Sequence, residues 1–277
     1  MSANVRRRYS GKKHRNRSDD EIRRGIYILP NIFTTANLFS GFFGLIAAVQ
    51  GKFNVAAIAI LISCMFDILD GKVARMTKSS SRFGVEYDSL ADLVAFGVTP
   101  AILMYLWTLQ PFGRLGWSAA FFFVACGALR LARFNVQVNS VQKKYFVGLP
   151  IPGAACMVAT TVLIFYHFDI TPPLKSFVLL FATFGLSFLM ISNIKYNSFK
   201  DSDLFRRKPF QSLLLTVFLF TIVAARPTVM LFSLMLLYTL SGPARYAFGL
   251  RKKVQAKLQP TGIEPSAKEG DSITRVE

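Results

Sequence analysis

Eight long apolar blocks constrain this chain more than any other feature of its 277-residue sequence. Each block runs for roughly 16 to 26 residues, and an α-helix needs about 20 apolar residues to cross ~30 Å of hydrocarbon. The mean hydropathy of +0.40 and the 27 Phe residues agree with helices in lipid. We therefore predict an all-α polytopic membrane protein. The expected spans are residues 31–50, 53–76, 84–109, 117–138, 151–168, 174–193, 210–225 and 227–249.

Positive charge is distributed unevenly between the loops that these spans create. The net charge is +18, with 33 Lys and Arg residues. With the N-terminus placed inside, 29 of these 33 fall in inside segments, and only Lys52, Arg114, Lys175 and Arg226 fall outside. This positive-inside pattern predicts a multi-pass protein of the cell's inner membrane with both termini cytoplasmic. Because the basic residues lie next to the spans, anionic lipid is favoured over nucleic acid as their partner.

The N-terminal segment carries two patterns of its own. Residues 1–17 are expected to be a disordered basic arm. Residues 18–30 begin with Ser18 and Glu21 in the spacing of a capping box and continue with apolar residues at helical spacing as far as Pro30. We predict a short amphipathic helix that lies in the cytoplasmic interface, with a simple leader as the alternative.

The C-terminal part of the chain is compatible with two arrangements. The block 210–225 is short, and Arg226 and Pro227 make a tight outer turn, so a re-entrant hairpin is an alternative to two full crossings. Residues 251–277 mix Pro, Gly and charge, and we predict a disordered cytoplasmic tail there. Residues 31–250 are then one transmembrane domain.

Four aspartates interrupt the second and third expected spans. Asp67 and Asp70 are three residues apart and Asp88 and Asp92 are four apart, so each pair shares one helix face. A loop of about seven residues, 77–83, makes the two spans antiparallel neighbours. At ~1.5 Å per residue both pairs lie roughly 6 to 14 Å below the cytoplasmic mouth. The four carboxylates are therefore expected to lie at one depth and to form a site open to the cytoplasm.

Charge at this depth needs a compensating partner. An ionised Asp near the centre of a membrane helix costs on the order of 2.5 to 3.5 kcal/mol. Two divalent cations would balance four carboxylates, and a ligand set of hard oxygens favours Mg²⁺ or Mn²⁺. Paired metals can hold a pyrophosphate and stabilise the attacking and leaving oxygens, which indicates phosphoryl-type transfer. A structural acid cluster and a cation or proton pathway are the alternatives.

Small residues accompany the acids on the same helix faces. Gly71 and Ala74 follow Asp67 at helical spacing, and Gly84 precedes Asp88 by one turn. Small residues here leave room for a bulky ligand, but they also allow close packing of helices in lipid. The spacing does not favour either interpretation.

The stretch from Asp67 to Asp92 has the pattern Asp-x2-Asp-Gly-x2-Ala-Arg-x8-Gly-x3-Asp-x3-Asp. At all eight fixed positions it resembles the signature of the CDP-alcohol phosphatidyltransferase family. The resemblance implies an enzyme that transfers a substituted phosphate from a CDP-linked lipid or alcohol to a hydroxyl acceptor and releases CMP. It implies that Asp67, Asp70, Asp88 and Asp92 bind two Mg²⁺ or Mn²⁺ ions, and that Asp92 is also the general base.

The same resemblance implies the nucleotide contacts. Gly71, Ala74 and Gly84 would admit the cytidine and phosphates, with Arg75 near the nucleotide. Asn31, Thr34 and Asn37 are polar residues, spaced three apart, at the mouth of the first span. They are expected either to contact the nucleotide or to cap that helix.

Three further segments, 30–37, 127–135 and 144–154, resemble the phosphatidylserine synthase branch of the family. This implies CDP-diacylglycerol and L-serine as substrates and phosphatidylserine and CMP as products. Glycerol 3-phosphate, inositol phosphate and choline remain alternative acceptors. The family resemblance also suggests a homodimer.

Four basic residues are candidates for substrate binding. Arg130 and Arg133 lie three residues apart on the inner half of the fourth span, where a guanidinium group needs an anion and can bind a carboxylate or phosphate in bidentate fashion. Lys78 and Arg82 belong to the basic mouth of the site. Snorkelling toward lipid headgroups is the alternative for the two arginines of the fourth span.

Overall fold

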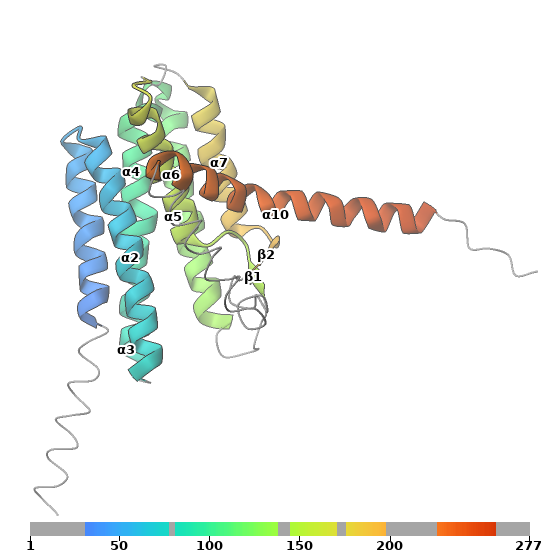
Figure 1. Cartoon of the computed structure of the whole chain (residues 1–277), viewed down its shortest axis with the longest axis horizontal. Helices are drawn as coiled ribbons and strands as arrows, with labels where there is room; N and C mark the ends of the chain where they lie inside the picture. The colour runs from blue at the N-terminus through green and yellow to red at the C-terminus, as the bar shows by residue number, and fades with distance from the viewer. Residues whose placement is uncertain (1–30, 78–80, 138–144, 171–175, 198–225, 259–277) are drawn as a thin grey trace, which may run out of the picture.

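The computed structural model describes residues 31–77, 81–137, 145–170, 176–197 and 226–258 (Figure 1). The expected basic arm, interfacial helix and seventh span lie outside the described residues, as does the chain beyond residue 258. In chain order the elements are a first helix Asn31–Val49, α2 Phe53–Thr77, α3 Arg82–Asp92, η1 Leu93–Val98, α4 Thr99–Met104, η2 Tyr105–Leu109, η3 Gln110–Phe112, α5 Arg114–Gln137, β1 Tyr145–Val147, α6 Ile151–His167, α7 Phe177–Ile191, β2 Lys195–Asn197 and α10 Pro227–Leu258.

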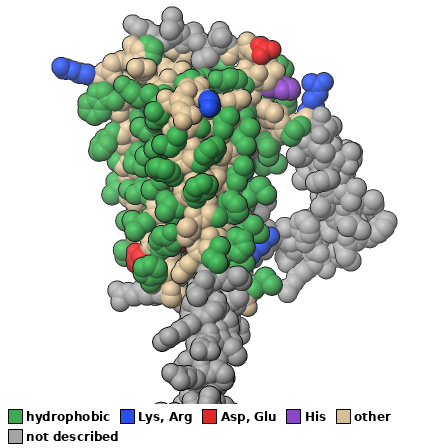
Figure 2. Space-filling view, turned by 90° about the vertical axis from the view of Figure 1, so that its left-hand side faces the viewer, with side chains coloured by type: hydrophobic (Ala, Val, Ile, Leu, Met, Phe, Trp, Pro, Cys, Tyr) green, Lys and Arg blue, Asp and Glu red, His purple; other side chains and the backbone are tan. Residues whose placement is uncertain are grey.

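Helices stand at every expected span that the structure describes. Five of them are long and apolar enough to cross a membrane, and α6 and α7 are shorter apolar helices of 17 and 15 residues. Figure 2 shows apolar side chains over the middle of one face, with charged side chains toward its two ends. The part of the chain that the structure describes is therefore a helical, polytopic membrane protein.

The first helix packs against both α2 and the third span. Ser40 Oγ donates to the carbonyl oxygen of Ala59 in α2 at 2.9 Å, and the Thr99 hydroxyl donates to the carbonyl oxygen of Gly41 at 2.9 Å. A Cβ atom added to Gly41 would lie 2.6 Å from the Cα of Ala95. Glycine is therefore needed here for backbone-to-backbone approach, as is common between membrane helices.

The third span is not a uniform α-helix. It contains two π-helical segments, η1 and η2, and η1 begins directly after Asp92. The Thr99 hydroxyl also donates to the carbonyl oxygen of Val94, five residues earlier, at 2.9 Å. Such widened turns occur often at functional sites.

A two-stranded antiparallel ladder joins the two loops that follow α5 and α7. Val147 pairs with Lys195, and Gly148 N–H donates to the carbonyl oxygen of Ile194 at 2.8 Å. Gly148 has φ of +82°, and a Cβ atom there would collide with the carbonyl oxygen of Met190. The ladder holds the start of α6 against the end of α7.

The last described helix differs from expectation in two ways. α10 continues to Leu258, so residues 251–258 are helical where a disordered tail was expected to begin. Figure 1 shows α10 running across the direction of the other helices, with its first part against the bundle and its last part beyond it. Among the described elements α10 packs against α6 and also contacts β2.

Candidate active site

Three of the four aspartates meet between α2 and α3. Asp67, Asp70 and Asp88 each offer a carboxylate oxygen, and these oxygens lie within 4.8 Å of one another. Asp70 is only 5% exposed, and the other two are half-buried. The i, i+3 spacing on α2 and the antiparallel approach of α3 produce this arrangement.

One oxygen of this cluster has no partner in the protein. Oδ1 of Asp88 is buried and accepts no hydrogen bond within the described ranges. A buried carboxylate oxygen without a donor is costly unless a cation or ligand contacts it. The three residues therefore fit a hard divalent cation, which prefers oxygen ligands.

The fourth aspartate, Asp92, lies one turn beyond Asp88 and outside the group of three. It is 8% exposed, and its Oδ1 accepts a hydrogen bond from Nδ2 of Asn37 at 3.0 Å. It remains within electrostatic range of the other three carboxylates. Asp92 is thus placed beside the cluster and held by the first helix.

The first helix also contacts the cluster directly. The Thr34 hydroxyl donates to Oδ2 of Asp70 at 3.2 Å. Asn31 lies beside Gly84, since a Cβ atom added to Gly84 would lie 3.4 Å from Oδ1 of Asn31. Both residues, expected near a nucleotide, therefore border the acidic helices, and no described contact bears on nucleotide binding itself.

The small residues of α2 and α3 have different surroundings. A Cβ on Gly71 would meet only Nη2 of the exposed Arg75, at 3.9 Å. A Cβ on Gly84 would lie 3.1 Å from Oγ of Ser81, which caps the same helix, and 3.4 Å from Oδ1 of Asn31 in the first helix. Ala74 is half-buried. Close helix packing therefore accounts for Gly84 better than for Gly71, which faces open space among the described residues.

The structure separates the two arginines of α5. Arg130 is half-buried, its buried Nε has no hydrogen-bond partner among the described residues, and it lies within electrostatic range of Asp92 and Tyr238. Arg133 instead donates from Nη1 to the carbonyl oxygen of Ile191 at 3.2 Å and to Oδ1 of Asn193 at 3.4 Å. Arg130 therefore has the free donor that an anion requires, and Arg133 is bound at the end of α7.

The remaining two basic candidates are Lys78 and Arg82. Lys78 lies outside the described residues, and the side chain of Arg82, which belongs to α3, is not described. Their expected roles in substrate binding stay predictions.

Sequence reasoning missed Ser63 beside Asp92, and it expected Asn37 to contact the nucleotide or to cap the first helix rather than to bind Asp92. Asn37 and Ser63 are both completely buried and are hydrogen-bonded to each other. A signal was present, since Asn37 follows Thr34 by three residues and Ser63 precedes Asp67 by four, so that each shares a helix face with a site residue.

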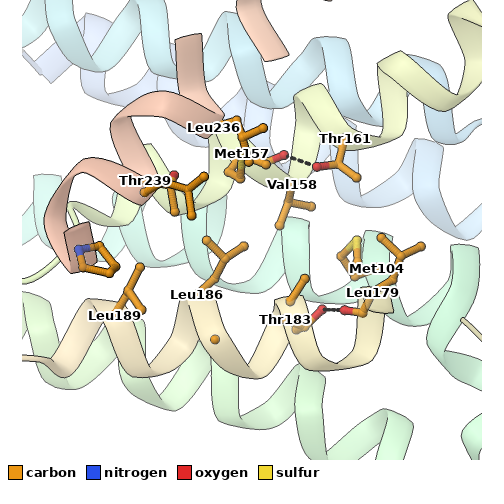
Figure 3. Close-up of a pocket in the computed structure, with 14 residues that line it drawn as sticks. Met104, Met157, Val158, Thr161, Leu179, Thr183, Leu186, Leu189, Leu236 and Thr239 are labelled. Carbon is orange, nitrogen blue, oxygen red and sulfur yellow. Dashed lines mark hydrogen bonds between the residues drawn. The ribbon is translucent and has the colours of Figure 1, made fainter. Parts of the chain in front are cut away.

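An apolar cavity of about 280 Å³ lies between α6, α7 and α10 (Figure 3). Its lining is hydrocarbon apart from threonines, and two of their hydroxyls are used within their own helices. Thr161 donates to the carbonyl oxygen of Met157 at 2.7 Å, and Thr183 to that of Leu179 at 2.8 Å. The cavity is therefore suited to hydrocarbon rather than to a polar ligand.

Comparison with known proteins identifies the family. Residues 27–193 match the family model described as CDP-alcohol phosphatidyltransferase. The chain belongs to this family. The match covers the whole acidic signature together with Arg130 and Arg133, so the residues of the candidate site all lie within the CDP-alcohol phosphatidyltransferase region.

Several curated members of the family are similar over long stretches. A CDP-diacylglycerol–serine O-phosphatidyltransferase of Helicobacter pylori is 39% identical over 225 residues, which cover 80% of this chain and 92% of that protein. The protein of the same name from Bacillus subtilis is 34% identical over 62% of this chain and 91% of its own length. An archaetidylserine synthase of Methanothermobacter thermautotrophicus is 36% identical over 61% of this chain and 69% of its own.

Proposed function

We propose that this protein is a CDP-diacylglycerol–serine O-phosphatidyltransferase. It transfers the phosphatidyl group of CDP-diacylglycerol to the hydroxyl of L-serine and forms phosphatidylserine and CMP. The observation that carries the proposal is the meeting of Asp67, Asp70 and Asp88 beside Asp92 in a member of this family. The names of the similar proteins support serine as the acceptor.

Asp67, Asp70 and Asp88 would hold two Mg²⁺ or Mn²⁺ ions, with Asp92 sharing in their binding. Bound divalent ions supply charge stabilisation for the pyrophosphate and for the leaving oxygen. The unpartnered Oδ1 of Asp88 supports this assignment. Asn31, Thr34, Gly71, Ala74, Arg75 and Gly84 form the proposed nucleotide-binding part of the site.

In the proposed reaction Asp92 accepts the proton of the serine hydroxyl. The serine oxygen then forms a bond to the phosphorus that bears diacylglycerol, and the bond from that phosphorus to the oxygen of CMP breaks. Arg130 would neutralise an anionic group of a substrate, and the buried Nε without a protein partner in the described ranges supports this role. In this proposal Asp92 removes a proton from the attacking hydroxyl, and Arg130 neutralises negative charge on a substrate.

The proposal includes an orientation in the membrane. The chain crosses the inner membrane eight times, with both termini and the site on the cytoplasmic side, an interfacial helix at residues 18–30, and a homodimer as its assembly. The distribution of the 33 basic residues supports this orientation. Single cysteines introduced in the two terminal segments test this orientation. Their reaction with an impermeant reagent is measured from each side of sealed vesicles.

An acceptor panel tests the activity. Purified protein with CDP-diacylglycerol and Mg²⁺ or Mn²⁺ is expected to release CMP on addition of L-serine and not with glycerol 3-phosphate, inositol phosphate or choline. CMP release with a different acceptor would overturn serine but not the transfer chemistry. Cation movement across liposomes without consumption of CDP-diacylglycerol would overturn the whole proposal.

A further inference from the structure

Three buried polar residues from three helices are connected in one line. Ser63 of α2 donates its hydroxyl hydrogen to Asn37 of the first helix, and Asn37 donates from Nδ2 to Oδ1 of Asp92 at the end of α3. Ser63 and Asn37 have no exposed surface, and Asp92 has 8%. Buried polar groups in a membrane protein are costly unless they are paired, so this arrangement needs an explanation.

The Ser63 hydroxyl fixes which end of the Asn37 amide faces Asp92. A serine hydroxyl has one hydrogen, which here lies between the backbone carbonyl oxygen of Asn37, at 2.8 Å, and the side-chain Oδ1 of the same residue. With Oδ1 taken by Ser63, the NH₂ group of the amide points to Asp92. The opposite orientation would place two acceptor oxygens against each other.

The donor from Asn37 in turn fixes the carboxylate of Asp92. An ionised carboxylate only accepts hydrogen bonds, so donors run in one direction from Ser63 through Asn37 to Asp92. Because the carboxylate is planar, holding Oδ1 at 3.0 Å from Nδ2 also sets the position of Oδ2. The backbone near Asp92 is held as well, since the first helix approaches Ala95 closely at Gly41.

We propose that Ser63 and Asn37 are positioning residues that orient the Asp92 carboxylate toward the reacting hydroxyl. The inference rests on the proposed function, in which Asp92 is the general base. Neither residue touches a substrate; Asn37 acts through Asp92, and Ser63 acts through Asn37. Residues that hydrogen-bond to site carboxylates in this way commonly affect activity strongly.

A matched pair of serine variants tests the role of Ser63. Ser63→Ala removes the hydroxyl that orients Asn37, whereas Ser40→Ala removes a buried hydroxyl that joins the same two helices but contacts only the backbone of Ala59. We expect Ser63→Ala to lower kcat about 10- to 100-fold with unchanged KM for both substrates, and Ser40→Ala to leave kcat unchanged. Equal kcat values for the two variants would overturn the proposal.

A double-variant cycle separates positioning from general stability. If Ser63 acts only through Asn37, then Ser63→Ala should have no further effect on kcat in an Asn37→Leu background. Additive losses would mean that Ser63 acts independently of Asn37, which contradicts the proposal. If Asn37→Leu does not fold, the matched serine pair decides.

A structural readout distinguishes this inference from the proposed function. An experimental structure of the Ser63→Ala variant should show the Asn37 side chain displaced from its position beside residue 63 and its contact to Asp92 lost. An unchanged contact would overturn the inference whatever the acceptor is. A wild-type protein that uses another acceptor would overturn the serine assignment alone, and the variants would then be compared with that acceptor.

Discussion

The hydroxyl of Thr34 donates a 3.2 Å hydrogen bond to Oδ2 of Asp70, and so links the first helix to the centre of the acidic cluster. Both residues are buried, and they are 36 positions apart in the chain. One turn further along the first helix, Asn37 makes the corresponding contact with Asp92. The first helix therefore supports carboxylates of both α2 and α3 from a single face.

Replacing Thr34 by Val should weaken divalent metal binding. Valine keeps the shape of threonine but cannot donate to Asp70, so the carboxylate loses a hydrogen bond that fixes its orientation. We expect Mn²⁺ affinity, measured by calorimetry on the purified protein, to fall about 10- to 100-fold. Thr160→Val is the matched control, since Thr160 is equally buried and donates only within its own helix, to the carbonyl oxygen of Cys156. Equal affinities of the two variants would contradict a role of Thr34 at the metal site.

Asp92→Asn should abolish turnover and leave the protein folded. The amide is close in shape to the carboxylate, and its oxygen can still accept from Asn37, but it cannot take a proton. The expected fall in kcat is about 10² to 10⁴-fold. The measurement is serine-dependent CMP release, with thermal unfolding as the control for folding. CMP release near the wild-type rate would rule out Asp92 as the base.

Gly41→Ala should destabilise the protein. The added methyl group would lie 2.6 Å from Cα of Ala95 and 2.7 Å from its Cβ, which no side-chain rotation can relieve. Overpacking of this kind costs about 1–3 kcal/mol. Thermal unfolding in detergent is the measurement. Gly185→Ala is the control, because nothing lies within 4 Å of a Cβ there; an unfolding temperature of the Gly41 variant equal to that of the control would contradict the close approach.

Gly71→Ala should affect substrate binding without affecting stability. A methyl group at this position meets only Nη2 of Arg75, at 3.9 Å, so the protein itself tolerates it. If the open space at Gly71 admits the nucleotide, the KM for CDP-diacylglycerol should rise about tenfold, which corresponds to ~1.4 kcal/mol. An unchanged KM would show that Gly71 does not border the substrate.

Lysine substitutions should distinguish Arg130 from Arg133. Lysine cannot reproduce a planar, bidentate guanidinium. We expect Arg130→Lys to lower kcat/KM for serine at least about tenfold, because its free donor is proposed to meet a substrate anion. Arg133→Lys should mainly lower the unfolding temperature, since Arg133 binds the end of α7. A larger loss of kcat/KM in the Arg133 variant would reverse these assignments.

The positions of the helices and of three site carboxylates were accessible from sequence because both depend on local spacing. Hydrocarbon thickness sets the length of an apolar block, and the helical repeat places Asp67 and Asp70 on one face. Because the loop before Asp88 is short, α3 must return beside α2. Spacing did not predict the different surroundings of Arg130 and Arg133. They lie three residues apart on one helix, yet Arg133 is hydrogen-bonded to the end of α7 and Nε of Arg130 has no partner among the described residues.

Sequence by itself determined a helical membrane protein with an acidic signature at one depth, because these features follow from hydropathy and from contacts within a few helical turns. Only the tertiary structure decided which groups support the acids. Ser63 meets Asn37 across 26 positions, and Asn37 meets Asp92 across 55. The tertiary structure also decided the π-helical turn after Asp92, the binding of Arg133 to α7, and the direction of α10. These depend on how helices approach each other. Helical spacing indicates which residues of one helix share a face, as it does for Thr34 and Asn37, but it does not indicate which residue of another helix they meet.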